Sequence, residues 1–123
     1  VVSQLNPGGA APAVKRAQVR RLNSGRWTLQ NTPSIQADSA IVLVYQGKSA
    51  AIDELAATQL LGSLIRTPYY QALRTEAQVG YIVSAFAFNI LDTPGLGFMV
   101  QSNSNPVGEL VQRTRKFVTA YAQ

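Results

Sequence analysis

The stretch that decides the fold is Leu73-Arg74-Thr75-Glu76-Ala77-Gln78-Val79-Gly80-Tyr81, which joins a helical pattern to a strand pattern. The residues before it repeat their apolar side chains at helical spacing up to about Glu76. From Tyr81 to Leu91 the chain is rich in β-forming residues that alternate, which predicts a strand. The stretch therefore places the guanidinium of Arg74 at a helix end and the phenol of Tyr81 at a strand start, where these two hydrogen-bond donors could face one cavity.

The residues before this stretch predict one strand and then helical structure. Ala40–Gln46 is almost wholly apolar, which is typical of a central strand that is covered on both faces. Ser49 is expected to cap the helix that follows. The stripe of that helix expected to face the core consists of Ile52, Ala56, Leu60 and Leu64, widened by Leu55 and Leu61. Thr67-Pro68 then indicates either a second helix or a kinked continuation of the first.

The residues after this stretch predict a hairpin and a last helix. Asp92–Gly95 has the composition of a turn, and Leu96–Ser102 is expected to return as the second strand of the hairpin. Asn105-Pro106 is expected to open the last helix. We interpret Phe86 and Phe88 as core residues in preference to a wall that binds peptides. The element order predicts an α+β fold of two layers, a sheet with a hairpin and helices packed on one face.

The length and the charge distribution divide the chain at residue 38. The 123 residues suit a single domain or a piece of one. Residues 1–37 read as a linker and a basic arm with a short strand at 26–30, and residues 38–123 as a partial domain with its own core. The net charge of +5 comes entirely from the arm, from the residues Lys15, Arg16, Arg20, Arg21 and Arg26, because six basic and six acidic residues follow it.

The sequence contains no cysteine and no histidine. Disulfides, thiolate chemistry and catalysis by Ser-His-Asp or Cys-His groups are therefore excluded within this chain. A zinc site of the usual kind is excluded as well, because the six carboxylates show no spacing typical of metal ligands. We expect no bound cofactor in this chain. No apolar run approaches the length of a membrane span, so we also expect no contact with a membrane.

From Asp38 to about Phe117 the sequence resembles the C-terminal half of the pitrilysin and insulin-degrading-enzyme superfamily of zinc metallopeptidases, the inverzincins. The bacterial protease III type matches best. The matching pieces cover about two-thirds of the chain: Asp38-Ser39-Ala40, Tyr69-Tyr70-Gln71-Ala72-Leu73-Arg74-Thr75-Glu76, Gln78-Val79-Gly80-Tyr81 and Phe98-Met99-Val100-Gln101-Ser102-Asn103. Val79 stands where leucine is usual in this family, a conservative difference.

This resemblance implies a role and a site. It implies a non-catalytic segment of a zinc oligopeptidase that closes the substrate chamber, with Arg74 and Tyr81 contacting the scissile peptide. Zinc is expected in the N-terminal half of the parent protein or in a partner subunit, bound by an inverted His-x-x-Glu-His motif and a downstream glutamate. The isolated chain would then be inactive, and the parent would be a zinc metalloendopeptidase. A periplasmic location follows from the same resemblance.

Three alternatives stay open from the sequence. Arg74 could pair with Glu76 or Asp53 on the surface, and Tyr81 could be an ordinary strand residue that is half-buried. The chain could also be a metal-free, peptidase-like module for binding or assembly. The basic residues 15–26 could contact nucleic acid, but Trp27 is the only aromatic residue near them, so we expect no such partner. We further expect the isolated chain to self-associate through uncovered apolar surface.

Overall fold

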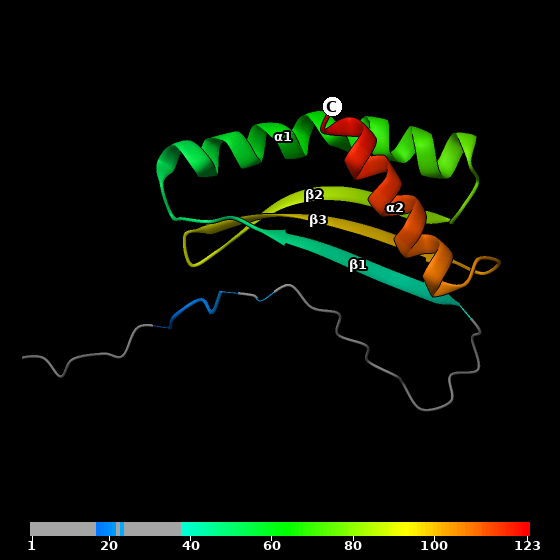
Figure 1. The fold of residues 1–123 in the computed structure, drawn as a ribbon, viewed down its shortest axis with the longest axis horizontal. Helices are drawn as coiled ribbons and strands as arrows, with labels where there is room; N and C mark the ends of the chain where they lie inside the picture. The colour runs from blue at the N-terminus through cyan, green and yellow to red at the C-terminus, as the bar shows by residue number, and fades with distance from the viewer. Residues whose placement is uncertain (1–16, 22, 24–37) are drawn as a thin grey trace, which may run out of the picture.

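The structure, a computed structural model, describes residues 17–21, 23 and 38–123. Its elements are β1 (Ser39–Gln46), α1 (Ile52–Tyr70), the π-helical turn η2 (Gln71–Glu76), β2 (Ile82–Ile90), β3 (Thr93–Ser102) and α2 (Val107–Tyr121). The strands form an antiparallel sheet, and both helices lie on one side of it (Figure 1). The predicted two-layer α+β fold is therefore confirmed. The expected strand at 26–30 and the basic residues Lys15, Arg16 and Arg26 lie outside the described residues.

Within the described residues the strand order is β1-β3-β2, so β3 is the central strand. Val100 of β3 is level with Ile41 of β1 and with Val83 of β2, and all three are buried. The prediction that residues 40–46 form a central strand covered on both faces was wrong. The helices cover one face only, so every second residue of β1 points to the other face, where Val42 is 58% exposed.

The core lies between the sheet and the two helices. Its centre is Tyr69, whose ring meets Phe98 of β3 at 5.2 Å and Phe117 of α2 at 5.1 Å between centroids. The hydroxyl groups of Tyr69 and Thr114 are 3.0 Å apart and form a buried hydrogen bond between α1 and α2. Both helices and the central strand are thus joined around one aromatic side chain.

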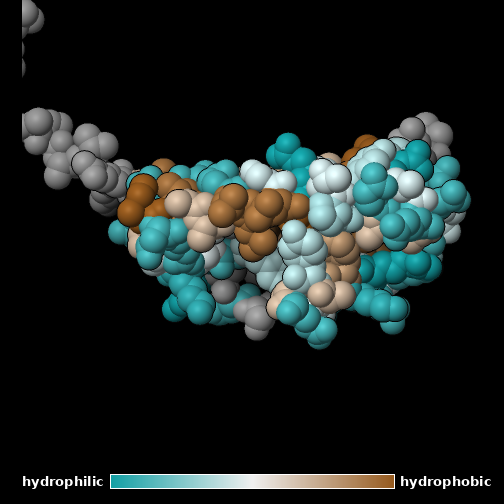
Figure 2. All heavy atoms as spheres, turned by 90° about the horizontal axis from the view of Figure 1, so that it is seen from above, coloured by the Kyte–Doolittle hydropathy of each residue, from teal (hydrophilic) through white to brown (hydrophobic). Residues whose placement is uncertain are grey.

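The face that α1 turns to the sheet differs from the predicted face. The buried residues of the helix are Gly62, Ile65 and Tyr69. The stripe expected to face the core is exposed instead, with exposed fractions of 80% for Ile52, 62% for Leu60 and 56% for Leu64. Seen from above, hydrophobic side chains are open to view on this side of the molecule (Figure 2). Nevertheless, no helix in the described part of the chain is both long and apolar enough to cross a membrane.

Gly62 explains why α1 turns a different face to the sheet from the one predicted. A Cβ atom at this position would lie 2.6 Å from the Cβ of Ala87 in β2, which is far inside van der Waals contact. The helix therefore approaches the sheet most closely where neither element carries a large side chain. This close approach turns the Gly62 face inward and the leucine stripe outward.

The start of α1 also differs from the prediction. The residue before the helix is Ala51, and no side chain caps it. Ser49 makes a hydrogen bond to the carboxylate of Glu54, which also accepts the backbone N–H of Ser49 at 3.0 Å. The hydroxyl of Ser49 and the backbone N–H of Lys48 lower the pKa of Glu54. Glu54 in the first turn therefore binds the segment before the helix, and Ser49 serves as its partner and does not cap the helix.

Pro68 lies inside the helical segment and does not begin a second helix. α1 continues past it into η2, so the alternative of a continued helix is confirmed. The last helix begins after Pro106, and Asn105 is not its cap. The side-chain amide of Asn105 donates to the carbonyl of Val79 at 2.8 Å. This residue thus holds the turn before β2 in place.

The β2–β3 hairpin turns at Leu91 and Asp92, two residues earlier than the sequence suggested. Both have positive φ, 47° and 65°, which suits a tight two-residue hairpin loop. Pro94 and Gly95 belong to β3. Phe86 and Phe88 are only half-buried and lie outside the core cluster, so the prediction that they are core residues was wrong.

Candidate functional site

Arg74 occupies the fourth position of η2, close to where the helical segment ends. The predicted placement at a helix end is therefore confirmed. Its side chain is exposed, and within the described part of the chain it forms no ion pair or hydrogen bond. The alternative pairing with Glu76 or Asp53 is thus not found. A π-helical turn widens the helix locally, and such turns are frequent at functional sites.

The turn between Arg74 and Tyr81 is fixed by its own backbone. The N–H of Val79 donates to the carbonyl of Leu73 at 2.8 Å, and the side chain of Val79 is fully buried. Gln78 has a φ of 48°, a backbone conformation that is typical of turns. Gly80 is required for a different reason, because a Cβ atom there would lie 2.5 Å from the carbonyl oxygen of Gln101. The chain is therefore pressed against β3 just before Tyr81.

Tyr81 directly precedes β2, as predicted for a residue at a strand start. Its backbone N–H donates to the carbonyl of Gln101 at 2.9 Å. Its side chain is 43% exposed, and its hydroxyl donates to the carboxylate of Asp38. The amide of Gln101 donates to the same carboxylate oxygen at 3.3 Å. Three side chains thus form a polar cluster beside the C-terminal end of β3.

The environment of Tyr81 favours the protonated form of its phenol over the phenolate. The hydrogen bond to Asp38 raises the pKa of Tyr81, partial desolvation and the negative charge of Asp38 raise it further, and the amide of Gln101 opposes them. At neutral pH the group is therefore a hydrogen-bond donor with one proton. In this geometry that proton is engaged by Asp38, so any other acceptor must compete with a carboxylate.

Asp38 is the residue that sequence reasoning missed. It was considered only as a carboxylate and as part of the matching motif, with no role beside Tyr81. The two residues are 43 positions apart, and they meet because β1 and β2 both pair with β3. The register provides a signal in retrospect, since Ser39 is level with Ser102 and Ile82 with Gln101. The residues just before β1 and β2 then flank the same end of β3.

The structure brings Tyr81 together with Asp38 and Gln101. A cavity shared by Arg74 and Tyr81 remains a prediction. The donor chemistry of this chain does not fit zinc, because histidine and cysteine are lacking in the sequence and the described residues contain no group of three carboxylates close enough to hold a metal.

Comparison with known proteins shows which family this chain resembles. Residues 60–123 match the family model described as "PQQ synthase PqqF-like, C-terminal lobe domain 4". The coenzyme PQQ synthesis protein F of Pseudomonas protegens is 39% identical over 89 residues, which are 72% of this chain and 11% of that protein. Protease 3 of Escherichia coli K12 is 36% identical over 83 residues, 65% of this chain and 8% of that protein. The crystal structure of pitrilysin matches with a TM-score of 0.57 and 30% identity, over 70% of this chain and 9% of that chain.

The fold and these matches define a C-terminal segment of a pitrilysin-type metallopeptidase, and the predicted resemblance is confirmed. Within that class, the chain belongs to the family of PqqF-like C-terminal lobe domains. The chain spans about a tenth of the length of the relatives named above.

Proposed function

We propose that this chain is the non-catalytic C-terminal segment of a zinc-dependent peptidase, and that it closes the substrate chamber and contacts the scissile peptide through Arg74 and Tyr81. The polar cluster of Tyr81 with Asp38 is the observation that carries the proposal most directly. It holds a partly exposed phenol, which is a hydrogen-bond donor, at a defined position beside the end of the central strand. The name of the Pseudomonas relative supports a further detail, a part in coenzyme PQQ synthesis for the protein that contains this chain.

Peptide hydrolysis explains why two donors would be useful. Attack on a peptide bond turns its carbonyl oxygen into an oxyanion, and positioned donors stabilise this developing charge. Arg74 has five N–H donors, and it has no partner among the described residues. Tyr81 must turn its single proton from Asp38 to the substrate. Asp38 therefore sets the free-energy cost of that exchange.

The zinc of the parent protein would be held elsewhere, in its N-terminal half or in a partner subunit. This gives a direct expectation for the isolated chain. The purified chain, supplied with zinc and a fluorogenic peptide, should show no turnover above buffer. Peptide hydrolysis that co-purifies with the chain would contradict the proposal.

The site is tested in the longest natural protein that contains this chain. Arg74→Ala and Tyr81→Phe should each lower kcat/KM by roughly 10²- to 10³-fold, the usual cost of removing one oxyanion donor. Bound zinc, measured by elemental analysis, should stay unchanged. Arg66→Ala and Tyr70→Phe are matched controls, because both residues are exposed on α1 and lie outside the polar cluster. Unchanged kinetics in both site variants, or equal losses in the controls, would remove the assignment.

A further inference from the structure

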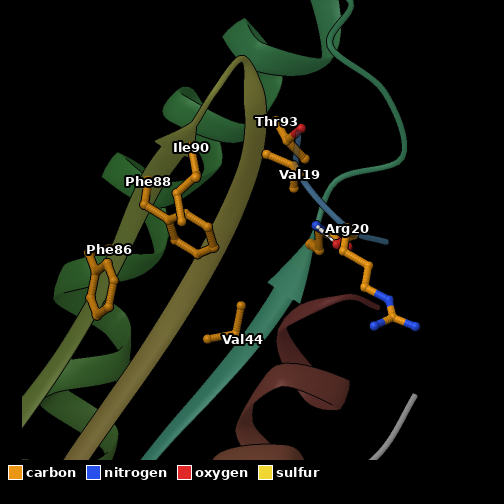
Figure 3. Close-up of a pocket in the computed structure, with 8 residues that line it drawn as sticks. Val19, Arg20, Val44, Phe86, Phe88, Ile90 and Thr93 are labelled. Carbon is orange, nitrogen blue, oxygen red and sulfur yellow. Dashed lines mark hydrogen bonds between the residues drawn. The ribbon is translucent and has the colours of Figure 1, made fainter. Parts of the chain in front are cut away.

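The sheet face without helices carries a groove of about 400 Å³. Its lining is mostly apolar and comes from all three strands and from the segment 17–21. The lining residues are Val19, Arg20, Val44, Gln46, Phe86, Phe88, Ile90 and Thr93 (Figure 3). Neither Arg74 nor Tyr81 takes part, so the groove is separate from the polar cluster.

Two glycines of β3 shape the floor of this groove. Gly97 is level with Phe86, and Gly95 is level with Phe88. A Cβ atom at Gly97 would lie 2.4 Å from the Cζ of Phe86, and one at Gly95 would lie 2.2 Å from the Cζ of Phe88. Both rings therefore lie over bare backbone, where side chains on β3 would otherwise displace them. The result is a shallow aromatic surface that stays open toward Val44 on β1.

A segment of the chain itself already lies on this surface. Residues 17–21 have no regular secondary structure, and Val19 is half-buried between the exposed Gln18 and Arg20. The side-chain amide of Gln46 donates to the carbonyl of Arg20 at 3.2 Å. In Figure 3 the side chain of Val19 lies beside Thr93 and Ile90, while the guanidinium of Arg20 points away from the groove. The segment thus offers the groove one branched apolar side chain and one backbone carbonyl.

We propose that this groove, together with the place beside it that Val19 and the carbonyl of Arg20 now take, is a binding site for an extended peptide from another molecule, one with a branched apolar side chain. The described contacts are generic, since any peptide has a carbonyl for Gln46 and many supply a valine for the aromatic surface. The proposal deepens the proposed function, because it adds a second contact surface for a peptide, separate from Arg74 and Tyr81. Binding of a peptide in the groove does not depend on the proposed function; only the statement that this peptide is a substrate rests on it.

A tethered segment competes strongly with a free peptide, because its effective concentration is high. The test therefore uses the full 123-residue chain with Val19→Asp, which weakens the contact of the tethered segment with the groove. The probe is a fluorescently labelled peptide with the sequence of residues 17–21, Ala-Gln-Val-Arg-Arg, followed by anisotropy. Its affinity for the Val19→Asp chain should exceed its affinity for the unaltered chain by about tenfold or more, because the competent state becomes more populated.

Matched controls separate this effect from charge and from folding. Gln18→Asp makes the same charge change one residue away and should leave the affinity unaltered. In the Val19→Asp background, Ile90→Ser should weaken binding about tenfold, whereas Leu91→Ser should not, although the two side chains are equally exposed, at 56% and 57%. A probe with aspartate in place of valine should bind neither chain.

Several results would overturn the proposal. These are failure of the Val19→Asp chain to bind the probe, equal binding of the aspartate probe, and an equal gain in affinity from Gln18→Asp. Dimerisation of the Val19→Asp chain without probe binding would show instead that a second copy fills the groove. Because these measurements need no zinc and no turnover, they can fail while the Arg74 and Tyr81 variants behave as proposed, and the reverse also holds.

Discussion

Replacing Tyr69 by phenylalanine tests how the end of α1 is held in place. Tyr69 is fully buried, and its hydroxyl meets that of Thr114 at 3.0 Å. Tyr69→Phe keeps the ring contacts with Phe98 and Phe117 but leaves the Thr114 hydroxyl buried without this partner. The cost of such a change is about 1–3 kcal/mol of unfolding free energy at neutral pH. Arg74 lies five residues further along the helical segment, so this bond also bears on the site.

The pH dependence of the unfolding free energy tests the role of Tyr69 more sharply than the loss of stability at one pH does. Burial raises the pKa of Tyr69 from 10.0 to about 12, against a smaller opposing effect of its hydrogen bond to Thr114. The folded state therefore holds this proton to higher pH than the unfolded state does. Its stabilising contribution is complete below pH 10 and is lost as pH rises from 10 through about 12. Two pKa units correspond to about 2–3 kcal/mol.

Urea unfolding followed by circular dichroism measures both effects. Well below pH 10, Tyr69→Phe should be the less stable protein, and the difference should shrink or reverse near pH 12 because phenylalanine has no proton to lose. Tyr70→Phe is the matched control, since Tyr70 is 46% exposed, and its change should stay within about 0.5 kcal/mol. If the two unfolding free energies differ by the same amount at every pH, the assignment of a buried phenol that titrates late is refuted.

Four further substitutions test separate features of the structure. Gly62→Ala should cost about 1–3 kcal/mol in thermal unfolding by forcing α1 off the sheet, whereas Gly108→Ala, with open space around it, should gain up to about 1 kcal/mol. Leu64→Lys should reduce self-association in sedimentation velocity, and an unchanged oligomer would show that the outer face of α1 takes no part. Asp38→Ala should lower the pKa of Tyr81 in an ultraviolet titration, and an unmoved titration would contradict their hydrogen bond.

The parts of the fold that the sequence predicted are those set by local chemistry. The strand ending at Gln46 and the helix around Ile65 follow from apolar patterns, and the placement of Arg74 and Tyr81 follows from the glycine between them. The face of α1 was mispredicted because the helix is apolar on two sides. The larger leucines suggested one side, but close contact at Gly62 selects the other, and that contact depends on β2.

The hydrogen-bond partner of Tyr81 could not be predicted from the sequence for a similar reason. Its hydrogen bond to Asp38 requires the register of two strand pairs, and no local pattern encodes that register. The same limit applies to Gly95 and Gly97. In the sequence Gly95 resembles a turn residue and Gly97 falls inside an expected strand. Only the pairing of β3 with β2 shows that both leave room for aromatic rings.

The two misread apolar patterns have a common physical cause. An apolar pattern predicts a core only if the chain buries its apolar surface within itself. In this chain Val42 on β1 and Leu64 on α1 are both exposed. The two uncovered faces differ, however. The outer face of α1 presents exposed leucines, which suits packing against another apolar surface, whereas the open sheet face has a shaped floor and an amide at Gln46. Their effects should therefore separate, since Leu64→Lys should change association and leave probe binding intact, and Ile90→Ser should do the opposite.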